Sequence, residues 1–154
     1  IMKSLAYSVF CLSFLFCFQG IADPTVFAGQ WSGKGTYIFD GEMSQCSDFN
    51  MMFSASVNTF TFASGNRSCD NHKESFYPVT MTYKEGKIFF NGSEVGFYTD
   101  STMEVGFRQP DGNSFRNWRM LMRRQGDHLM YEESRRMDGD NTPLISFAGL
   151  LIKQ

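Results

Sequence analysis

The chain has 154 residues, of which 42% are hydrophobic, 16% aromatic and 19% charged, and its formal net charge is -2. This length fits one compact domain, and the apolar content excludes intrinsic disorder. The slight acidic excess argues against binding to nucleic acid or to anionic membranes, because both need a basic surface.

The first residues have the pattern of an export signal. Met2-Lys3 gives a positive start, Leu5–Phe18 is an apolar run, and Gly20-Ile21-Ala22 has the small-x-small form that signal peptidase accepts. The run is shorter than the roughly 20 apolar residues that cross a bilayer, so a signal peptide fits better than a permanent anchor. We expect cleavage after Ala22, a mature domain over 23–154, and a secreted or periplasmic protein.

The mature sequence favours strands over helices. Leu and Ala are scarce, and Phe, Tyr, Thr, Met and Ser fill their places in segments that alternate between apolar and polar residues. Turn signals recur about every 8–12 residues. About ten strands are predicted: Gly29–Phe39, Cys46–Ser56, Thr59–Cys69, Ser75–Lys84, Lys87–Phe90, Glu94–Thr99, Thr102–Arg108, Ser114–Arg124, Asp127–Arg136 and Leu144–Ile152.

Short connections make the predicted sheet antiparallel, because a parallel pair needs a crossover of a dozen or more residues. Glu85-Gly86, Asn91-Gly92, Pro110–Asn113 and Gln125-Gly126 are the expected turns. The sheet has one apolar face and no helix to cover it, so it must curl on itself. We therefore predict an all-β, single antiparallel up-and-down barrel in which the last strand seals against the first. An open β-sandwich is the alternative.

Two cysteines, Cys46 and Cys69, remain after the predicted leader. A hairpin centred just after Val57 places them directly opposite each other, so a cross-strand disulfide is expected, in keeping with export. The two cysteines do not have the Cys-x-x-Cys spacing of a redox-active pair. Two cysteines and two scattered histidines do not form a zinc ligand set, so no metal site is predicted. The same register predicts two further cross-strand pairs, Asp48 with Arg67 and Phe53 with Phe62.

The first predicted strand resembles a known signature. Gly29-Gln30-Trp31-Ser32-Gly33-Lys34-Gly35 is similar to the Gly-x-Trp start of the calycins, the superfamily of lipocalins and fatty-acid-binding proteins. Gly29 lets the chain turn into the strand, and Trp31 is expected to close one barrel end. The resemblance covers this strand and the meander architecture.

Two departures from the pattern of fatty-acid-binding proteins argue against that branch of the calycins. The Asp40–Gln45 segment is too short for the helix pair of fatty-acid-binding proteins, and the last strand lacks their Arg-x-Tyr clamp. The start also resembles nitrobindin-type barrels, which hold haem through a late histidine. The nearest candidate here, His128, adjoins a turn and falls on the outward face, so no cofactor is predicted.

The resemblance and the predicted inward face together suggest a ligand chamber. Tyrosine hydroxyls would add hydrogen-bonding points to an apolar interior, and Met adapts to irregular ligands, although small barrels are often packed solid. Arg116 and Glu133 fall near one barrel end, where the arginine could hold an anionic head group. The candidate ligand-binding residues are Tyr37, Tyr77, Met81, Tyr83, Phe90, Phe97, Phe107, Arg116, Trp118, Met120, Tyr131 and Glu133.

These features predict a monomeric, non-enzymatic barrel that binds a small hydrophobic or amphipathic molecule. One alternative is a packed interaction module that presents the Arg-rich hairpin Ser114–Arg136 to an acidic partner. Another is a lipocalin-fold isomerase or lyase that uses Tyr and Arg. In the hairpin, exposed pairs of Arg119 with Glu132 and of Arg124 with Asp127 are expected.

Overall fold

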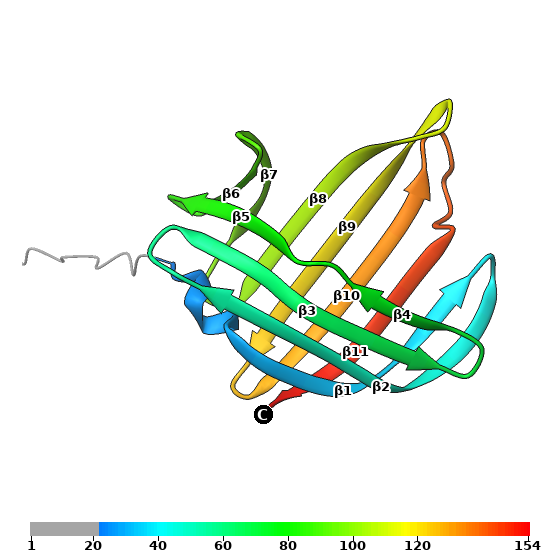
Figure 1. The fold of residues 1–154 in the computed structure, drawn as a ribbon, viewed down its shortest axis with the longest axis horizontal. Helices are drawn as coiled ribbons and strands as arrows, with labels where there is room; N and C mark the ends of the chain where they lie inside the picture. The colour runs from blue at the N-terminus through cyan, green and yellow to red at the C-terminus, as the bar shows by residue number, and fades with distance from the viewer. Residues whose placement is uncertain (1–21) are drawn as a thin grey trace, which may run out of the picture.

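The computed structural model describes residues 22–154, so the predicted export segment, apart from Ala22, lies outside the described residues. The described chain is a closed antiparallel β-barrel (Figure 1), which confirms the predicted fold class. Its elements are a short 3-10 helix η1 (Pro24–Phe27) and the strands β1 (Gly29–Phe39), β2 (Glu42–Ala55), β3 (Thr59–Cys69), β4 (Lys73–Phe76), β5 (Val79–Lys84), β6 (Lys87–Phe90), β7 (Ser93–Tyr98), β8 (Thr102–Asp111), β9 (Ser114–Gln125), β10 (His128–Met137) and β11 (Ile145–Lys153). None of its helices is long and apolar enough to cross a membrane.

Closure takes place where the first and last strands meet. Strand β1 pairs with β11 along its length and with β2 on its other edge, and β2 in turn pairs with β3. Strands β4 and β5 follow each other along β3, opposite Gly65–Ser68 and Thr59–Phe62 respectively, so together they occupy one strand position. The barrel therefore has ten positions.

The prediction of one continuous strand over Ser75–Lys84 was wrong. The structure breaks it at Tyr77-Pro78, between β4 and β5. Proline has no N–H to donate to a sheet and is confined to edges and breaks, which explains the interruption. The break lies beside the pocket described below.

Glycine is required at the barrel seam. A Cβ atom added at Gly33 would collide with the carbonyl oxygen of Leu150 on β11, and one at Gly35 would lie 2.6 Å from the carbonyl oxygen of Ala148. The register of β1 against β2 also shifts between these two glycines. The glycines of the first strand thus let β1 approach β11 closely enough to close the barrel.

We expect Gly33→Ala to destabilise the protein by about 1–3 kcal/mol, because the obstructing atoms are backbone and cannot move aside cheaply. Gly106→Ala is the matched control, since a Cβ there would meet only Trp118 O at 3.6 Å, an ordinary contact. Urea unfolding of both variants checks this. Equal stabilities for the two variants would contradict the seam argument.

The β2–β3 hairpin contains the predicted disulfide, Cys46–Cys69, and the predicted Phe53–Phe62 pair. The predicted pairing of Asp48 with Arg67 was wrong: Phe49 lies opposite Arg67 instead. The register shifts once between Cys46 and Asp48 and shifts back between Met52 and Phe53. The first shift has its extra residue on β2 and the second has its extra residue on β3, between Phe62 and Ser64. The extra residue on β3 reverses the faces of the residues that follow it, and this turns Arg67 into the barrel.

The β9–β10 hairpin turns one residue later than predicted. Gln125 pairs with His128, so the turn is Gly126-Asp127, and Arg119 lies opposite Ser134 rather than Glu132. The predicted pair of Arg124 with Asp127 is likewise absent from the register, where Arg124 faces Leu129. Each residue of β9 thus lies opposite a β10 residue two positions after the predicted one. Side chains on a strand alternate with a period of two, so every side chain keeps its predicted face.

One end of the barrel is filled by the N-terminal segment. Phe27 and Trp31 have no exposed surface, and Trp31 Nε1 donates a hydrogen bond to the Phe27 carbonyl oxygen at 2.9 Å. The Asp23 side chain caps η1 by accepting from the Thr25 N–H at 2.9 Å. This end is closed, so access to the interior must come from elsewhere.

Candidate functional site

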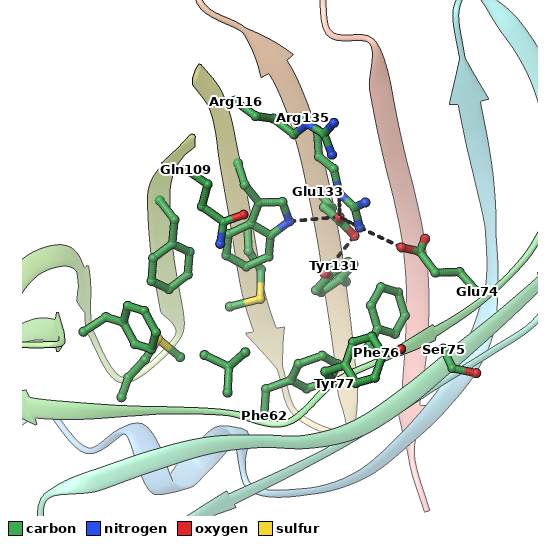
Figure 2. A pocket seen from close by; sticks show the side chains of 16 residues that line it. Phe62, Glu74, Ser75, Phe76, Tyr77, Gln109, Arg116, Tyr131, Glu133 and Arg135 are labelled. Carbon is green, nitrogen blue, oxygen red and sulfur yellow. Dashed lines mark hydrogen bonds and ion pairs between the residues drawn. The ribbon is translucent and has the colours of Figure 1, made fainter. Parts of the chain in front are cut away.

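A partly open cavity of about 400 Å³ lies on the inner side of the strands of the barrel (Figure 2). This volume falls in the range of small-molecule sites. Apolar side chains from β3, β4, β5, β6, β8, β9 and β10 contribute to it, together with a group of charged residues. The interior is therefore not packed solid.

On two neighbouring strands, β8 and β9, the side chains that line the cavity change from polar to apolar along the strand. Along β9 the inward side chains run Arg116, Trp118, Met120 and Met122, and Met122 is fully buried. The facing residues of β8 follow the same order, with Gln109 opposite Arg116 and Phe107 opposite Trp118. The cavity therefore has a polar mouth, an aromatic middle and an apolar floor.

The mouth opens because the β6–β7 hairpin is short, whereas β8 and β9 extend far past it (Figure 1). Strand β7 meets β8 only at Met103–Val105, and among the described strands β4 pairs with β3 alone. Side chains from both flanks of this gap line the cavity, among them Phe76 and Gln109. Tyr77 lines it too and is 86% exposed, which places it at the rim.

Four charged residues form a closed ring beside the mouth. Arg67 binds Glu74 and Glu133, the latter at 3.2 Å between Nη1 and Oε2. Arg135 Nη2 completes the ring at 2.9 Å from Glu74 Oε1 and 2.8 Å from Glu133 Oε1. Two positive and two negative charges alternate, so the ring is neutral overall, which makes its burial tolerable.

Arg67 and Glu133 are the buried half of this ring, with side chains 0% and 1% exposed. The Arg67 guanidinium lies over the Tyr37 ring, 4.7 Å from its centroid, and near the Phe147 ring at 5.2 Å. Glu133 also accepts hydrogen bonds from Trp118 Nε1 at 2.9 Å and from Tyr131 Oη at 3.3 Å. The two carboxylate oxygens of Glu133 thus have four side-chain partners in all.

Glu74 in the ring and Tyr131 beside it have shifted pKa values. Burial raises the pKa of Glu74, but Arg67 and Arg135 outweigh burial and hold that pKa below its ordinary value. Burial raises the pKa of Tyr131 well above its ordinary value, and the neighbouring Glu133 raises it further. Glu74 is therefore charged and Tyr131 protonated at neutral pH.

The lowered pKa of Glu74 predicts acid sensitivity. A carboxyl whose pKa falls on folding stabilises the protein above its unfolded pKa, and that contribution is lost as pH falls through the lower folded pKa. We expect wild type to exceed Glu74→Gln in unfolding free energy at pH 7, with the difference shrinking below about pH 4.5, the ordinary value. Urea unfolding across this range tests it. Glu85→Gln, at an 81% exposed side chain, is the control, and a difference for Glu74→Gln that stayed constant with pH would contradict the assignment.

The structure brings most of the predicted ligand-binding residues together, and nine of the twelve line the cavity: Tyr77, Met81, Phe90, Phe107, Arg116, Trp118, Met120, Tyr131 and Glu133.

Three predicted positions lie away from the cavity. Tyr37 is buried and stacks on His72 with ring centroids 4.7 Å apart, and Tyr83 donates a hydrogen bond to the Ser56 carbonyl oxygen at 2.5 Å. The inward placement of Phe97 was wrong, since it is 45% exposed. An extra residue in β7 shifts its register against β6 and reverses the faces beyond it.

Sequence reasoning missed several residues of the site. Arg67 was predicted only as the cross-strand partner of Asp48, and Glu74 lies outside the strand predicted from Ser75. Gln109 and Arg135 were not among the candidates, although both share the inward parity of chosen neighbours on β8 and β10. That parity was the available signal for these two, whereas no signal marked the bulge that turns Arg67 inward.

Most arginines of the Arg-rich hairpin are engaged within the chain. Arg119 pairs with Glu104 at 2.7 Å, and Arg123 pairs with Glu132 at 3.0 Å. Arg116 Nη2 lies 2.5 Å from Asp111 Oδ2. Intramolecular carboxylates thus already neutralise much of the charge that an acidic partner would need.

No protein-family model matches the chain, and no curated protein matches it. Among solved structures, the chain is similar to the S-type phycobiliprotein lyase CPES from Guillardia theta, with a TM-score of 0.55. The two share 10% sequence identity over 84% of this chain and 89% of that one. The fold is calycin-like. At this identity the likeness concerns the fold alone.

The described residues were also considered as ligands of a metal or of haem. No group of three or more metal-ligating side chains suited to a metal ion occurs within residues 22–154. His128, the histidine considered as a haem ligand, is exposed on the outer side of the barrel.

Proposed function

We propose that this calycin-like barrel binds a small amphipathic molecule in the cavity beside the β6–β7 hairpin. The observation that carries the proposal is the graded lining of a 400 Å³ cavity, with guanidinium and amide groups at the mouth and apolar side chains at the floor. Amphipathic ligands have the same division between a polar end and an apolar body.

The mouth offers groups that a ligand's polar end can use. Arg116 and Arg135 lie on the adjacent strands β9 and β10 and gather at one end of the pocket in Figure 2. Glu133 is already bound on both oxygens by residues of the chain, so it serves the site by holding its neighbours. We assign the recognition of an anionic or hydrogen-bonding head group to Arg116, Arg135 and Gln109.

A cavity-filling variant tests the proposal. Met120 is buried on the cavity side of β9, whereas Met130 on β10 is 46% exposed on the outer face. Native mass spectrometry of protein isolated from its own host is expected to detect a bound small molecule in wild type and in Met130→Trp. Met120→Trp is expected to lack it.

Circular dichroism keeps that comparison interpretable, because a misfolded Met120→Trp would also lose ligand. In that case Val79→Phe, which intrudes from the opposite wall, replaces it. Repeated isolation of wild-type protein without any bound molecule, together with no binding of added amphipathic probes, would overturn the proposal.

Export of the protein forms part of the proposal. The Cys46–Cys69 disulfide is in keeping with an oxidising compartment. N-terminal sequencing of the mature protein is expected to begin at Asp23, after removal of residues 1–22. A mature protein that retained Leu5–Phe18 would contradict this assignment.

We further propose that the exported protein is a monomer.

A second candidate is a lyase, favoured by the likeness to the phycobiliprotein lyase and by Tyr131. Tyr131 lines the cavity, and its raised pKa keeps its hydroxyl protonated at neutral pH, so that it acts as a hydrogen-bond donor. Under this alternative, Tyr131→Phe would retain ligand binding but leave the bound molecule chemically unchanged. Identical released products from wild type and Tyr131→Phe would exclude a role for the Tyr131 hydroxyl in the reaction.

A further inference from the structure

The middle of the cavity has a flat aromatic wall. Phe107 on β8 and Trp118 on β9 are directly opposite residues, and their rings stack with centroids 5.1 Å apart and planes 26° apart. Phe90 on β6 meets Phe107 edge-on, with centroids 5.0 Å apart and planes at 79°. All three line the cavity. The wall therefore presents ring surface, not the rounded surface of aliphatic side chains.

The indole of this wall is fixed in orientation. Trp118 Nε1 donates to Glu133 Oε1 at 2.9 Å, and Glu133 is itself held by Arg67 and Arg135. Rotating the indole would leave a buried carboxylate short of a partner, which is costly. The charged ring thus keeps the indole in its stacked position before any ligand arrives, and such preorganisation lowers the cost of binding.

A second aromatic pair lines the cavity from other strands. Phe62 on β3 and Phe76 on β4 have centroids 5.6 Å apart and planes at 57°. Figure 2 shows both away from the end where Arg116 and Arg135 lie. A ligand between β4 and β9 would therefore meet aromatic carbon from more than one side, which favours ring-to-ring contact.

One guanidinium at the mouth is only partly engaged within the chain. The Arg116 side chain lines the cavity and is 38% exposed, and its Nη2 binds Asp111. Gln109 faces Arg116 across the β8–β9 pair. The exposed part of the Arg116 guanidinium can donate to a ligand oxygen, and an anionic oxygen at the end of the ligand gives the strongest such bond.

We infer that the cavity selects a flat ring system carrying an anionic group over a flexible acyl chain, with Trp118 as the residue that determines this preference. The inference rests on the proposed function and specifies its ligand class. The flat part of the ligand lies against Trp118, and its anionic group lies toward Arg116.

Two carboxylates with equal numbers of carbon atoms test the inference: 2-naphthoate, which is flat, and undecanoate, which is a flexible chain. Isothermal titration of the mature, disulfide-bonded protein is expected to give an affinity for 2-naphthoate at least five-fold higher than that for undecanoate. Trp118→Leu is expected to abolish this preference, whereas Trp118→Phe, which keeps a flat ring, is expected to retain most of it. Phe97→Leu, on the outer face, is the control and should change neither affinity.

The outcomes separate the inference from the proposed function. Equal or tighter binding of undecanoate to wild type would overturn the inference and leave the amphipathic-ligand proposal standing. An unchanged preference in a folded Trp118→Leu would overturn the role of Trp118. Binding of neither carboxylate, nor of any co-purified molecule, would overturn both proposals.

Discussion

Replacing Arg67 with methionine is expected to lower the unfolding free energy by about 3–5 kcal/mol, because it leaves buried Glu133 without one of its two cationic partners. Methionine has a similar length and keeps contact with the surrounding rings, so the change reports mainly on charge. Urea unfolding monitored by circular dichroism gives the measurement. Arg119→Met, at a pair that is 49% and 31% exposed, is the control and should cost less than about 1 kcal/mol.

A double variant separates the loss of charge from the loss of shape. Arg67→Met combined with Glu133→Gln removes one charge of each sign and leaves the Glu74–Arg135 pair at 2.9 Å. We expect the double variant to be more stable than Arg67→Met alone, since removing both partners avoids an uncompensated buried charge. A loss below about 1 kcal/mol for Arg67→Met, or a double variant less stable than the single one, would contradict this account.

The barrel was predictable because alternation records which face of a strand is buried. Closure followed from a single apolar face with no covering helix, and the last strand, apolar on both faces, does pair with β1. Two-residue turns such as Glu85-Gly86 and Asn91-Gly92 were predicted correctly, since the first residue of each has a positive φ that few residue types adopt readily.

The site was only partly predictable because bulges leave no mark in the alternation. One extra residue reverses every face that follows it, and this is why Phe97 turned out to be exposed and Arg67 buried. The break at Pro78 had a readable signal in the proline itself. Whether the interior was hollow or packed depended on the relative reach of β4, β7 and β8, which strand patterns alone do not fix.

The disulfide is expected to contribute to stability on a scale similar to the charged ring. Cys46 and Cys69 are separated by 23 residues and are both buried. The loop-closure model gives about 3 kcal/mol for a crosslink of this span. We therefore expect Cys46→Ala combined with Cys69→Ala to lose about that amount in urea unfolding. A stability equal to that of wild type would contradict a structural role for the bond.

The disulfide and the charged ring should also be coupled. The bulge that turns Arg67 inward lies on β3 between Phe62 and Ser64, whereas the other bulge of the hairpin lies on β2 and begins beside Cys46. Arg67 is two residues before Cys69, close to the β2 bulge. If the crosslink holds the β2 bulge in place, its removal loosens the end of β3 that carries Arg67 and weakens the Arg67–Glu133 contact. The effects of Arg67→Met and of the double alanine variant are then less than additive, by more than about 0.5 kcal/mol in a double-mutant cycle. Strict additivity would mean that the bulge is held by the β2–β3 hydrogen bonds alone, with the disulfide acting only on the unfolded chain.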